Sequence, residues 1–230
     1  MSARQKREKV WLTVYAPPYF GGSPIATIPT SRPESAVGRV VEVTLYDLLK
    51  LDPSQYVIKL YFQIERVEGA EAYTRYKGHE YTVEYLNSLV RRGTSMVNWI
   101  HDYRTKDGLD LRVYVVVFTQ YRINTSRKHA IRMVAHNILQ ARVPEMTLGQ
   151  YAQEAVLGRL ASEIHNEAKK VAVLRHVGIR KTKLLTKLEE RPPLELPYQI
   201  GGISGAQGAG QQRRSSAGPE PVIRGDVIAL

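Results

Sequence analysis

The feature that most constrains this chain is an Asp-Gly pair between two strand-like segments, residues 96–105 and 109–120. Asp107-Gly108 is typical of a type I′ β-hairpin turn, in which both central residues adopt positive φ angles. The second segment alternates apolar and polar residues with the period of two that a half-buried strand shows. Its apolar positions are Leu109, Leu111, Val113, Val115 and Val117. The pattern therefore predicts an antiparallel hairpin with one buried face.

Other segments also have strand character. Residues 40–45, 56–64 and 72–77 are rich in β-branched and aromatic residues, as strands usually are. A later segment, residues 175–185, is a basic strand candidate. Together with the hairpin, these segments predict a sheet of several strands.

Helical patterns lie between the predicted strands. Thr82 is a candidate N-cap for a short helix with Leu86, Leu89 and Val90 on one face. Residues 126–141 keep their apolar residues at helical spacing. Residues 147–150 have a capping-box pattern, which would open a helix reaching about residue 171. This order predicts an α+β domain with a mostly antiparallel, barrel-like sheet and two or three flanking helices.

The composition divides the chain into three parts. Residues 1–35 are basic at first and then rich in Pro, Gly and Ser, so we expect an extended basic N-terminal arm. Residues 36–188 hold the predicted strands and helices and form the folded body. Residues 189–230 are rich in Gly, Ser and Gln and carry little apolar surface to offset their ordering entropy. We expect them to form a flexible, disordered C-terminal tail.

The net charge indicates a polyanionic partner. Lys and Arg number 33 against 22 Asp and Glu, a net charge of +11, and the pI is near 9.8. Such an excess is typical of proteins that bind nucleic acid or anionic membranes. No run approaches the ~18–20 apolar residues that span a bilayer, and no apolar segment follows the basic N-terminus as in a secretory signal. The chain has no cysteine, hence no disulfide or thiolate metal site. We expect a cytosolic protein that binds nucleic acid.

Motifs for catalysis are missing from the sequence. There is no Gly-x-Ser-x-Gly nucleophile elbow and no Gly-x-x-x-x-Gly-Lys phosphate loop. None of the six histidines has a strong metal-ligand spacing to another histidine or a carboxylate. Asp102, Asp107 and Asp110 surround the predicted hairpin, and the turn explains them better than a nuclease site does. We predict no enzymatic activity, no catalytic residues, no metal and no cofactor.

Four basic clusters are the candidate RNA-binding sites. The longest covers residues 169–187 and contains no acidic residue, so its charges repel one another unless an anion neutralises them. Alternation along a strand would place Lys181 and Lys183 on one face, where they can follow a phosphate backbone. The alternative is a solvated run of charge. The candidate residues are Lys169, Lys170, Arg175, Arg180, Lys181 and Lys183.

The second cluster surrounds the predicted start of the helix over residues 126–141. Backbone amides without partners and the positive end of the helix dipole meet at a helix start, which makes it a natural phosphate site. The alternative is that Thr125 or Ser126 only caps the helix, and both interpretations can hold together. The candidate residues are Arg122, Thr125, Ser126, Arg127, Lys128 and Arg132.

The third and fourth clusters are shorter. The third lies in the turn after the short helix, where guanidinium and hydroxyl groups suit a contact with the RNA backbone. The fourth is the basic start of the arm. The candidate residues of the third are Arg91, Arg92, Thr94 and Ser95, and those of the fourth are Arg4, Lys6, Arg7 and Lys9.

Aromatic residues leave one question open. Trp11 and Tyr15 follow the basic start of the chain and could stack on bases. Equally, the alternation of Trp11, Thr13 and Tyr15 fits a strand that covers the core. The sequence has no pair of aromatic residues typical of an RNA-recognition motif, no helix-turn-helix pattern and no zinc finger. We therefore expect recognition of RNA backbone and shape rather than of base sequence.

Several segments, in matching order and spacing, resemble one protein family. They are residues 14–22 (VYAPPYFGG), 38–43 (GRVVEV), 59–62, 76–80, 85–92, 104–108, 125–132 and 179–181. Over about residues 9–187 the chain is similar to the archaeal and eukaryotic small-subunit ribosomal proteins of the S-one-e family, also called S-three-a-e. The short chain resembles archaeal members. Gly93 and Arg127 depart from the family pattern, which usually has a basic residue and Gln there.

The resemblance implies a structural constituent of the small ribosomal subunit (30S or 40S) with a β-barrel body, which supports translation in the cytoplasm. It implies binding to the 3′ region of the small-subunit ribosomal RNA, on the platform near the messenger exit. The partners it implies are neighbouring platform proteins and messenger RNA at the exit, and it brings no catalytic residues. The alternative is a free translation or RNA-processing factor that binds ribosomes transiently.

Overall fold

The computed structural model describes residues 9–50 and 52–186. Arg4, Lys6 and Arg7 of the predicted arm and the predicted tail over residues 189–230 lie outside the described residues. The described strands are β1 (Val10–Tyr15), β2 (Pro24–Thr30), β3 (Val40–Thr44), β4 (Ile58–Glu68), β5 (Glu71–Tyr81), β6 (Met96–Arg104), β7 (Asp110–Thr119) and β8 (Leu174–Leu184). The described α-helices are α1 (Leu45–Leu49), α2 (Val83–Leu89), α3 (Thr125–Arg142), α4 (Leu148–Val156) and α5 (Arg159–Ala168). None of these helices is long and apolar enough to cross a membrane.

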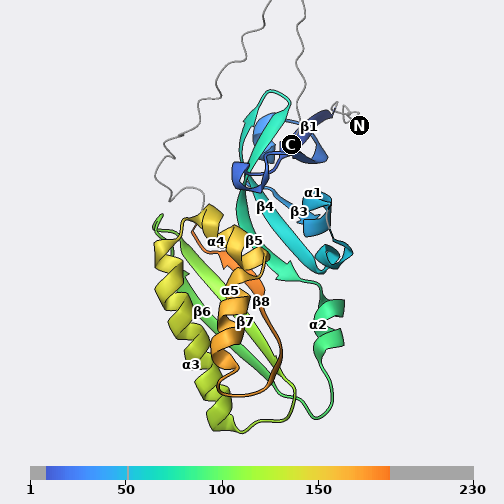
Figure 1. The fold of residues 1–230 in the computed structure, drawn as a ribbon. Helices are drawn as coiled ribbons and strands as arrows, with labels where there is room; N and C mark the ends of the chain where they lie inside the picture. The colour runs from blue at the N-terminus through green and yellow to red at the C-terminus, as the bar shows by residue number, and fades with distance from the viewer. Residues whose placement is uncertain (1–8, 51, 187–230) are drawn as a thin grey trace, which may run out of the picture. The chain divides into compact units, whose positions relative to one another are not determined.

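The described strands form one sheet that branches at β5 (Figure 1). One edge of β5 pairs with β4 along the length of the strand. The other edge pairs first with β1, in parallel over residues 71–73, and then with β8, antiparallel over residues 78–80. All the remaining pairings are antiparallel, which confirms the predicted α+β class and sheet type. No pairing among the described strands closes the sheet, so it is open and not a complete barrel.

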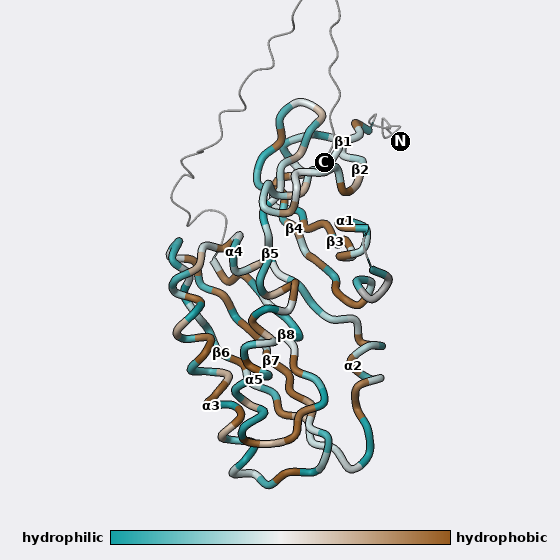
Figure 2. The backbone as a smooth tube through the Cα atoms, in the orientation of Figure 1, coloured by the Kyte–Doolittle hydropathy of each residue, from teal (hydrophilic) through white to brown (hydrophobic). Residues whose placement is uncertain are grey.

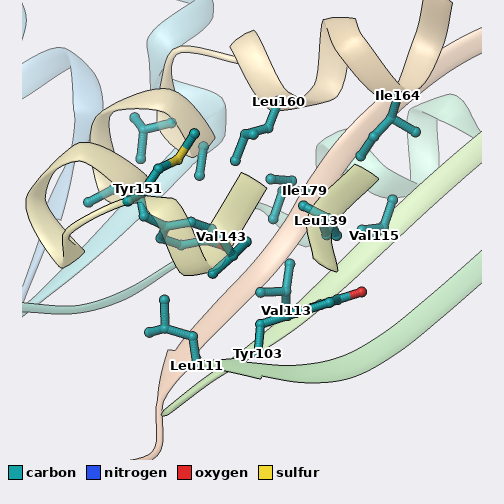
Figure 3. Packing of buried hydrophobic residues seen from close by; sticks show 14 of the residues in the cluster. Tyr103, Leu111, Val113, Val115, Leu139, Val143, Tyr151, Leu160, Ile164 and Ile179 are labelled. Atoms are coloured by element: carbon teal, nitrogen blue, oxygen red, sulfur yellow. The ribbon is translucent and has the colours of Figure 1, made fainter. Parts of the chain in front are cut away.

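Helices α3, α4 and α5 cover one face of the β8-β7-β6 branch (Figure 1). Figure 3 shows Leu139 of α3 and Ile164 of α5 packing toward Val115 of β7 and Ile179 of β8, and all four are almost completely buried. Figure 2 shows hydrophobic residues along β7. Truncating any one of these core side chains to Ala costs about 2–5 kcal/mol in typical proteins. The flanking helices predicted from apolar spacing are therefore the cover of the main core.

Helix α2 covers part of the opposite face of the same branch. Leu86 packs there against Val116 and Phe118 of β7. Residues with the other parity on β7, such as Val115 and Val117, belong to the core under α3. The strand is thus buried on both faces near its end, because neighbouring side chains of a strand point to opposite sides of the sheet.

The predicted hairpin is present, but its turn differs from the predicted type I′. Strands β6 and β7 pair in register from Met96 with Phe118 to Arg104 with Asp110. The loop between them is five residues long, and the Gly108 amide donates to the Thr105 carbonyl at 3.0 Å. Gly108 alone in this loop has a positive φ, 74°, whereas type I′ needs two such residues.

Asp107 also makes a hydrogen bond outside the hairpin, to the start of α4. Its Oδ2 accepts a hydrogen bond of 2.7 Å from the Leu148 amide, the first amide of α4. Thr147 and Gln150 form the predicted capping box at the same helix start. The hairpin loop and the capping box therefore together satisfy three amides at the start of α4, those of Thr147, Leu148 and Gln150.

The single helix predicted from residue 147 to about residue 171 is two helices. α4 ends at Val156, and α5 begins at Arg159. Gly158 between them has φ 79°, a left-handed conformation that an α-helix cannot continue through and that glycine adopts without strain. The apolar spacing predicted the helical segments correctly, and the glycine that separates them was overlooked.

The predicted extended arm over residues 1–35 is wrong for residues 10–30. These residues form the β1-β2 hairpin, which joins the sheet through β5. Leu12 and Val14 are fully buried, whereas Trp11 is 62% exposed. Of the two open interpretations of the aromatic residues, the strand is present, but its buried side chains are the aliphatic ones. Apolar alternation thus outweighs the Pro and Gly content, and the folded body begins at β1 rather than at residue 36.

Candidate nucleic-acid interface

Parts of three of the four predicted basic clusters meet at one end of the β8-β7-β6 branch. Hydrogen bonds join the turn after α2 to the loop after β7. The Ser95 amide donates to Thr119 Oγ1 at 3.0 Å, and the Thr119 amide donates to the Ser95 carbonyl at 3.0 Å. The Ile123 amide donates to Ser95 Oγ at 3.2 Å. These bonds hold the turn with Arg91 beside the loop that leads into α3.

The start of β8 joins the same end of the branch. Arg175 Nη1 donates to the carbonyl of Leu89, the last residue of α2, at 3.2 Å. The Gln120 amide donates to the Val173 carbonyl at 3.0 Å. In Figure 1 this end is the lower one, where β7 leads into α3 and α5 leads into β8. We call this surface the basic end, and its cations are Arg91, Arg92, Arg122, Arg127, Lys128, Lys169, Lys170 and Arg175.

The basic end carries little negative charge. Its three segments, residues 89–96, 119–129 and 169–176, contain no Asp or Glu. Lys170 Nζ lies 2.7 Å from Glu167 Oε2, but both side chains are exposed, and such a pair contributes little to binding or stability. Cations that are gathered from several elements create a positive field, which attracts a polyanion.

Helix α3 begins inside the basic end. Its N-cap is Asn124, whose side chain makes no capping hydrogen bond, and its first turn has no acidic residue. One interpretation of the sequence was that Thr125 or Ser126 caps the helix. Both are instead the first two helical residues. Both are exposed. The first amides of a helix have no partner within the helix, so this start can donate hydrogen bonds to a phosphate.

The hydroxyl groups predicted for the third cluster serve the turn itself. Ser95 is 5% exposed, and its Oγ accepts from the Ile123 amide. Thr94 Oγ1 donates to the Arg91 carbonyl at 2.7 Å. We therefore assign Ser95 and Thr94 to the shape of the turn, while Arg91 and Arg92 are exposed.

The Arg180, Lys181 and Lys183 group lies further along β8, away from the basic end. Thr182 is buried and shares a 3.0 Å hydrogen bond with the Tyr151 hydroxyl of α4, so Lys181 and Lys183 share the other face, as alternation predicts. Lys181 forms an ion pair with a carboxylate of β5, whereas Lys183 is exposed. The long basic run is thus divided between two places on the sheet.

The two remaining described candidates, Arg132 and Lys9, are not among the cations of the basic end. Arg132 Nε donates to the Asn98 carbonyl at 3.1 Å, which ties α3 to β6. Lys9 is exposed directly before β1, and the exposed Trp11 follows it.

The part of the chain that is similar to known proteins includes all the elements that build this surface. A family model described as the Ribosomal S3Ae family matches residues 3–188. The chain belongs to this family. The small ribosomal subunit protein eS1 of Desulfurococcus amylolyticus is 45% identical over 177 residues, which are 77% of this chain and 83% of that protein. The protein of the same name from Staphylothermus marinus is 42% identical over 197 residues, 84% of this chain and 92% of that protein. The one from Aeropyrum pernix is 44% identical over 183 residues, 78% and 85% of the two chains.

Sequence reasoning missed one feature of this S3Ae family chain. Beside the basic end, a cavity of about 420 Å³ is lined by residues of α5, β8 and the end of β5, among them His165, His176 and Tyr81. The two histidines are eleven positions apart on different elements, so no local spacing could reveal them. The described residues hold no group of three or more His, Asp or Glu side chains arranged for a metal ion.

Proposed function

We propose that this S3Ae family chain is a structural constituent of the small ribosomal subunit that binds ribosomal RNA through the basic end. The observation that carries the proposal is the meeting of three cationic segments, none with an acidic residue, on one end of a rigid sheet. The relatives named small ribosomal subunit protein eS1 support the ribosomal part. The role is non-enzymatic, and its place is the ribosome of the cytoplasm.

The chemistry of the basic end suits phosphate rather than base recognition. Guanidinium groups such as Arg91 and Arg122 can donate paired hydrogen bonds to one phosphate. Each phosphate that the protein neutralises releases counterions, so affinity falls steeply with salt. The start of α3 adds backbone amides that need no side chain. Such contacts fix the position of the protein on folded RNA and do not read sequence.

The resemblance to the family supports a finer proposal. We propose that the RNA is the 3′ region of the small-subunit ribosomal RNA, on the platform near the messenger exit. The further partners would be neighbouring platform proteins and messenger RNA that leaves there. A structural constituent is expected in about one copy per subunit, whereas a factor that visits ribosomes transiently is expected in smaller amounts.

A charge-matched pair of variants tests the basic end. One variant carries Arg91→Ala, Arg122→Ala and Arg127→Ala, and the other carries Arg39→Ala, Lys106→Ala and Arg159→Ala, which are exposed cations elsewhere on the fold. Affinity for the 3′ region of the ribosomal RNA is measured across a salt series. The first variant should reduce the slope of log affinity against log salt by up to about three, since each lost phosphate contact removes about one. Equal effects of the two variants would refute the assignment of the basic end.

A further inference from the structure

The cavity beside the basic end exists because one edge of β8 is only partly paired. β8 pairs with β5 through Lys181–Lys183 alone. Before these residues, β8 pairs with β7 on its other edge, and no described strand pairs with the edge toward the cavity. Helix α5 and Tyr81, the last residue of β5, line the space of about 420 Å³ that remains there.

The cavity lining mixes apolar and polar groups, and several of the polar ones come from α5. Ala161 and Val177 are buried apolar residues in its lining. Ser162, His165 and Asn166 also line it, and their spacing of three and four residues places them on one side of α5. A flat ring with apolar faces and hydrogen-bonding edges matches such a lining, and cavities that hold small ligands usually measure about 300–1,000 Å³.

His176 contributes a buried polar atom that lacks a partner. Its Nε2 makes no hydrogen bond within the described residues. The His176 ring lies 6.5 Å from the Tyr81 ring, centroid to centroid, and both residues line the cavity. Burial, together with neighbouring Arg175 and His165, lowers the pKa of His176. The lowered pKa favours the neutral imidazole. Its Nε2 has almost no exposed area, so what the residue offers a ligand is its ring, which can pack against a flat base.

Arg175 connects the cavity to the basic end. It lines the cavity, and its Nη1 is held by the Leu89 carbonyl. A guanidinium has five N–H donors, so this bond leaves most of them available for a phosphate. The cavity lining contains Arg175 and two histidines and no carboxylate, which favours a ligand with negative charge next to an aromatic ring.

We propose that this cavity receives one unpaired nucleotide of the ribosomal RNA, with its base beside Tyr81 and His176 and its phosphate on Arg175. The inference rests on the proposed function, because it takes the RNA to be already held by the basic end. It adds one specific contact to a surface that otherwise recognises backbone. RNA suits such a site, since unstacked bases can be splayed out and stacked on aromatic and histidine rings.

Ser162→Trp fills the cavity from its exposed α5 side, and Gln140→Trp places the same side chain on an exposed position of α3 outside the cavity lining. Small subunits are reconstituted with each full-length variant and with the unchanged protein. Base-specific chemical modification and hydroxyl-radical footprinting of the ribosomal RNA are then compared. The unchanged protein and Gln140→Trp should protect one unpaired base that becomes at least fivefold more reactive with Ser162→Trp. The backbone footprint should stay the same in all three particles.

The two proposals fail in different ways in this experiment. Unchanged base reactivity in Ser162→Trp particles that keep the backbone footprint would overturn the nucleotide pocket alone. A chain that leaves no footprint on the RNA would overturn the proposed function and this inference with it. An Asn166→Ala variant gives a milder second test, and it should raise the reactivity of the same base. Reactivity that changes at a different base, or at none, would count against the pocket.

Discussion

Lys181 Nζ of β8 and Glu80 Oε2 of β5 form an ion pair at the place where these two strands pair with each other. Both side chains are about one quarter exposed, 25% and 24%. The pair therefore lies at the seam where the β8 branch meets β5. A lysine from the longest basic run of the sequence thus helps to hold the sheet together.

We predict that Lys181→Ala lowers the free energy of unfolding by more than it weakens the free energy of RNA binding. Loss of this partly buried pair should cost about 1 kcal/mol, since exposed pairs contribute less and buried ones more. Lys183→Ala, two residues along the same face, removes an exposed charge and should leave the melting temperature nearly unchanged. Thermal unfolding and RNA titration of both variants check this. An equal loss of stability in the two would show that the seam does not depend on the pair.

We predict a loss of stability between about pH 6.5 and pH 4 that depends on His79. Its ring is buried, with Nδ1 2.5 Å from the Tyr76 hydroxyl and Nε2 3.1 Å from the Ile179 carbonyl. Burial lowers the pKa of His79 from 6.5 to about 4. Between these values the unfolded chain binds a proton that the folded chain does not, so stability falls as the pH falls.

The matching variant is His79→Gln, which cannot titrate. It should be less stable at pH 7, because the buried hydrogen bonds are altered, but its stability should vary less between pH 6.5 and pH 4. Urea unfolding at several pH values measures this. A variant whose pH dependence is as steep as that of the unchanged protein would rule out His79 as its source.

Gly78 marks a close approach between β5 and β8, and we predict that Gly78→Ala is strongly destabilising. An added Cβ would overlap the Thr182 carbonyl oxygen, so the strands would have to separate where they pair. The cost should reach about 3 kcal/mol, within the range of severe core substitutions. Gly69→Ala is the control, because its φ is also positive, 61°, but open space surrounds it. It should cost about 1 kcal/mol. Thermal unfolding distinguishes the two, and similar losses would contradict the steric explanation.

Asp107 should stabilise the chain through α4 rather than through the hairpin turn. Asp107→Ala removes the acceptor of the Leu148 amide and should cost about 1 kcal/mol, as the loss of a helix cap does. Asp107→Asn keeps an oxygen acceptor and should lose less than half of that. Chemical denaturation of both variants provides the measurement. If Asn and Ala are equally harmful, the carboxylate charge matters more than the hydrogen bond.

Local patterns predicted much of this fold. The alternation at Val113 and Val115 correctly indicated a strand whose alternate residues face the core, although the end of β7 is buried on both faces. The capping box at Thr147 marked the start of α4 correctly. These features succeed because they depend on neighbours in sequence. The branch at β5 could not be predicted in this way, since it joins Tyr15 to Tyr73 and Glu80 to Lys181, and such pairings depend on how whole strands pack.

The candidate interface shows the same division. Counting charges found the cations near Arg91, Arg127 and Arg175, but only the hydrogen bonds around Ser95 and Leu89 bring their segments together. The pattern of charge could not separate exposed cations from those with a structural partner. It also gave no sign of the cavity beside Arg175, because its lining comes from three elements.

The most direct test of the central claim uses the absence of cysteine from the sequence. Ser126→Cys at the start of α3 and Gln140→Cys near its end create single attachment points on exposed positions of one helix, roughly 21 Å apart at 1.5 Å per residue. An iron chelate on each cysteine generates hydroxyl radicals that cut nearby RNA in reconstituted small subunits. We predict strong cuts in the ribosomal RNA from Ser126→Cys, clearly stronger than from Gln140→Cys. Particles that contain the Ser126→Cys protein but show no cuts from that position would contradict binding through the basic end.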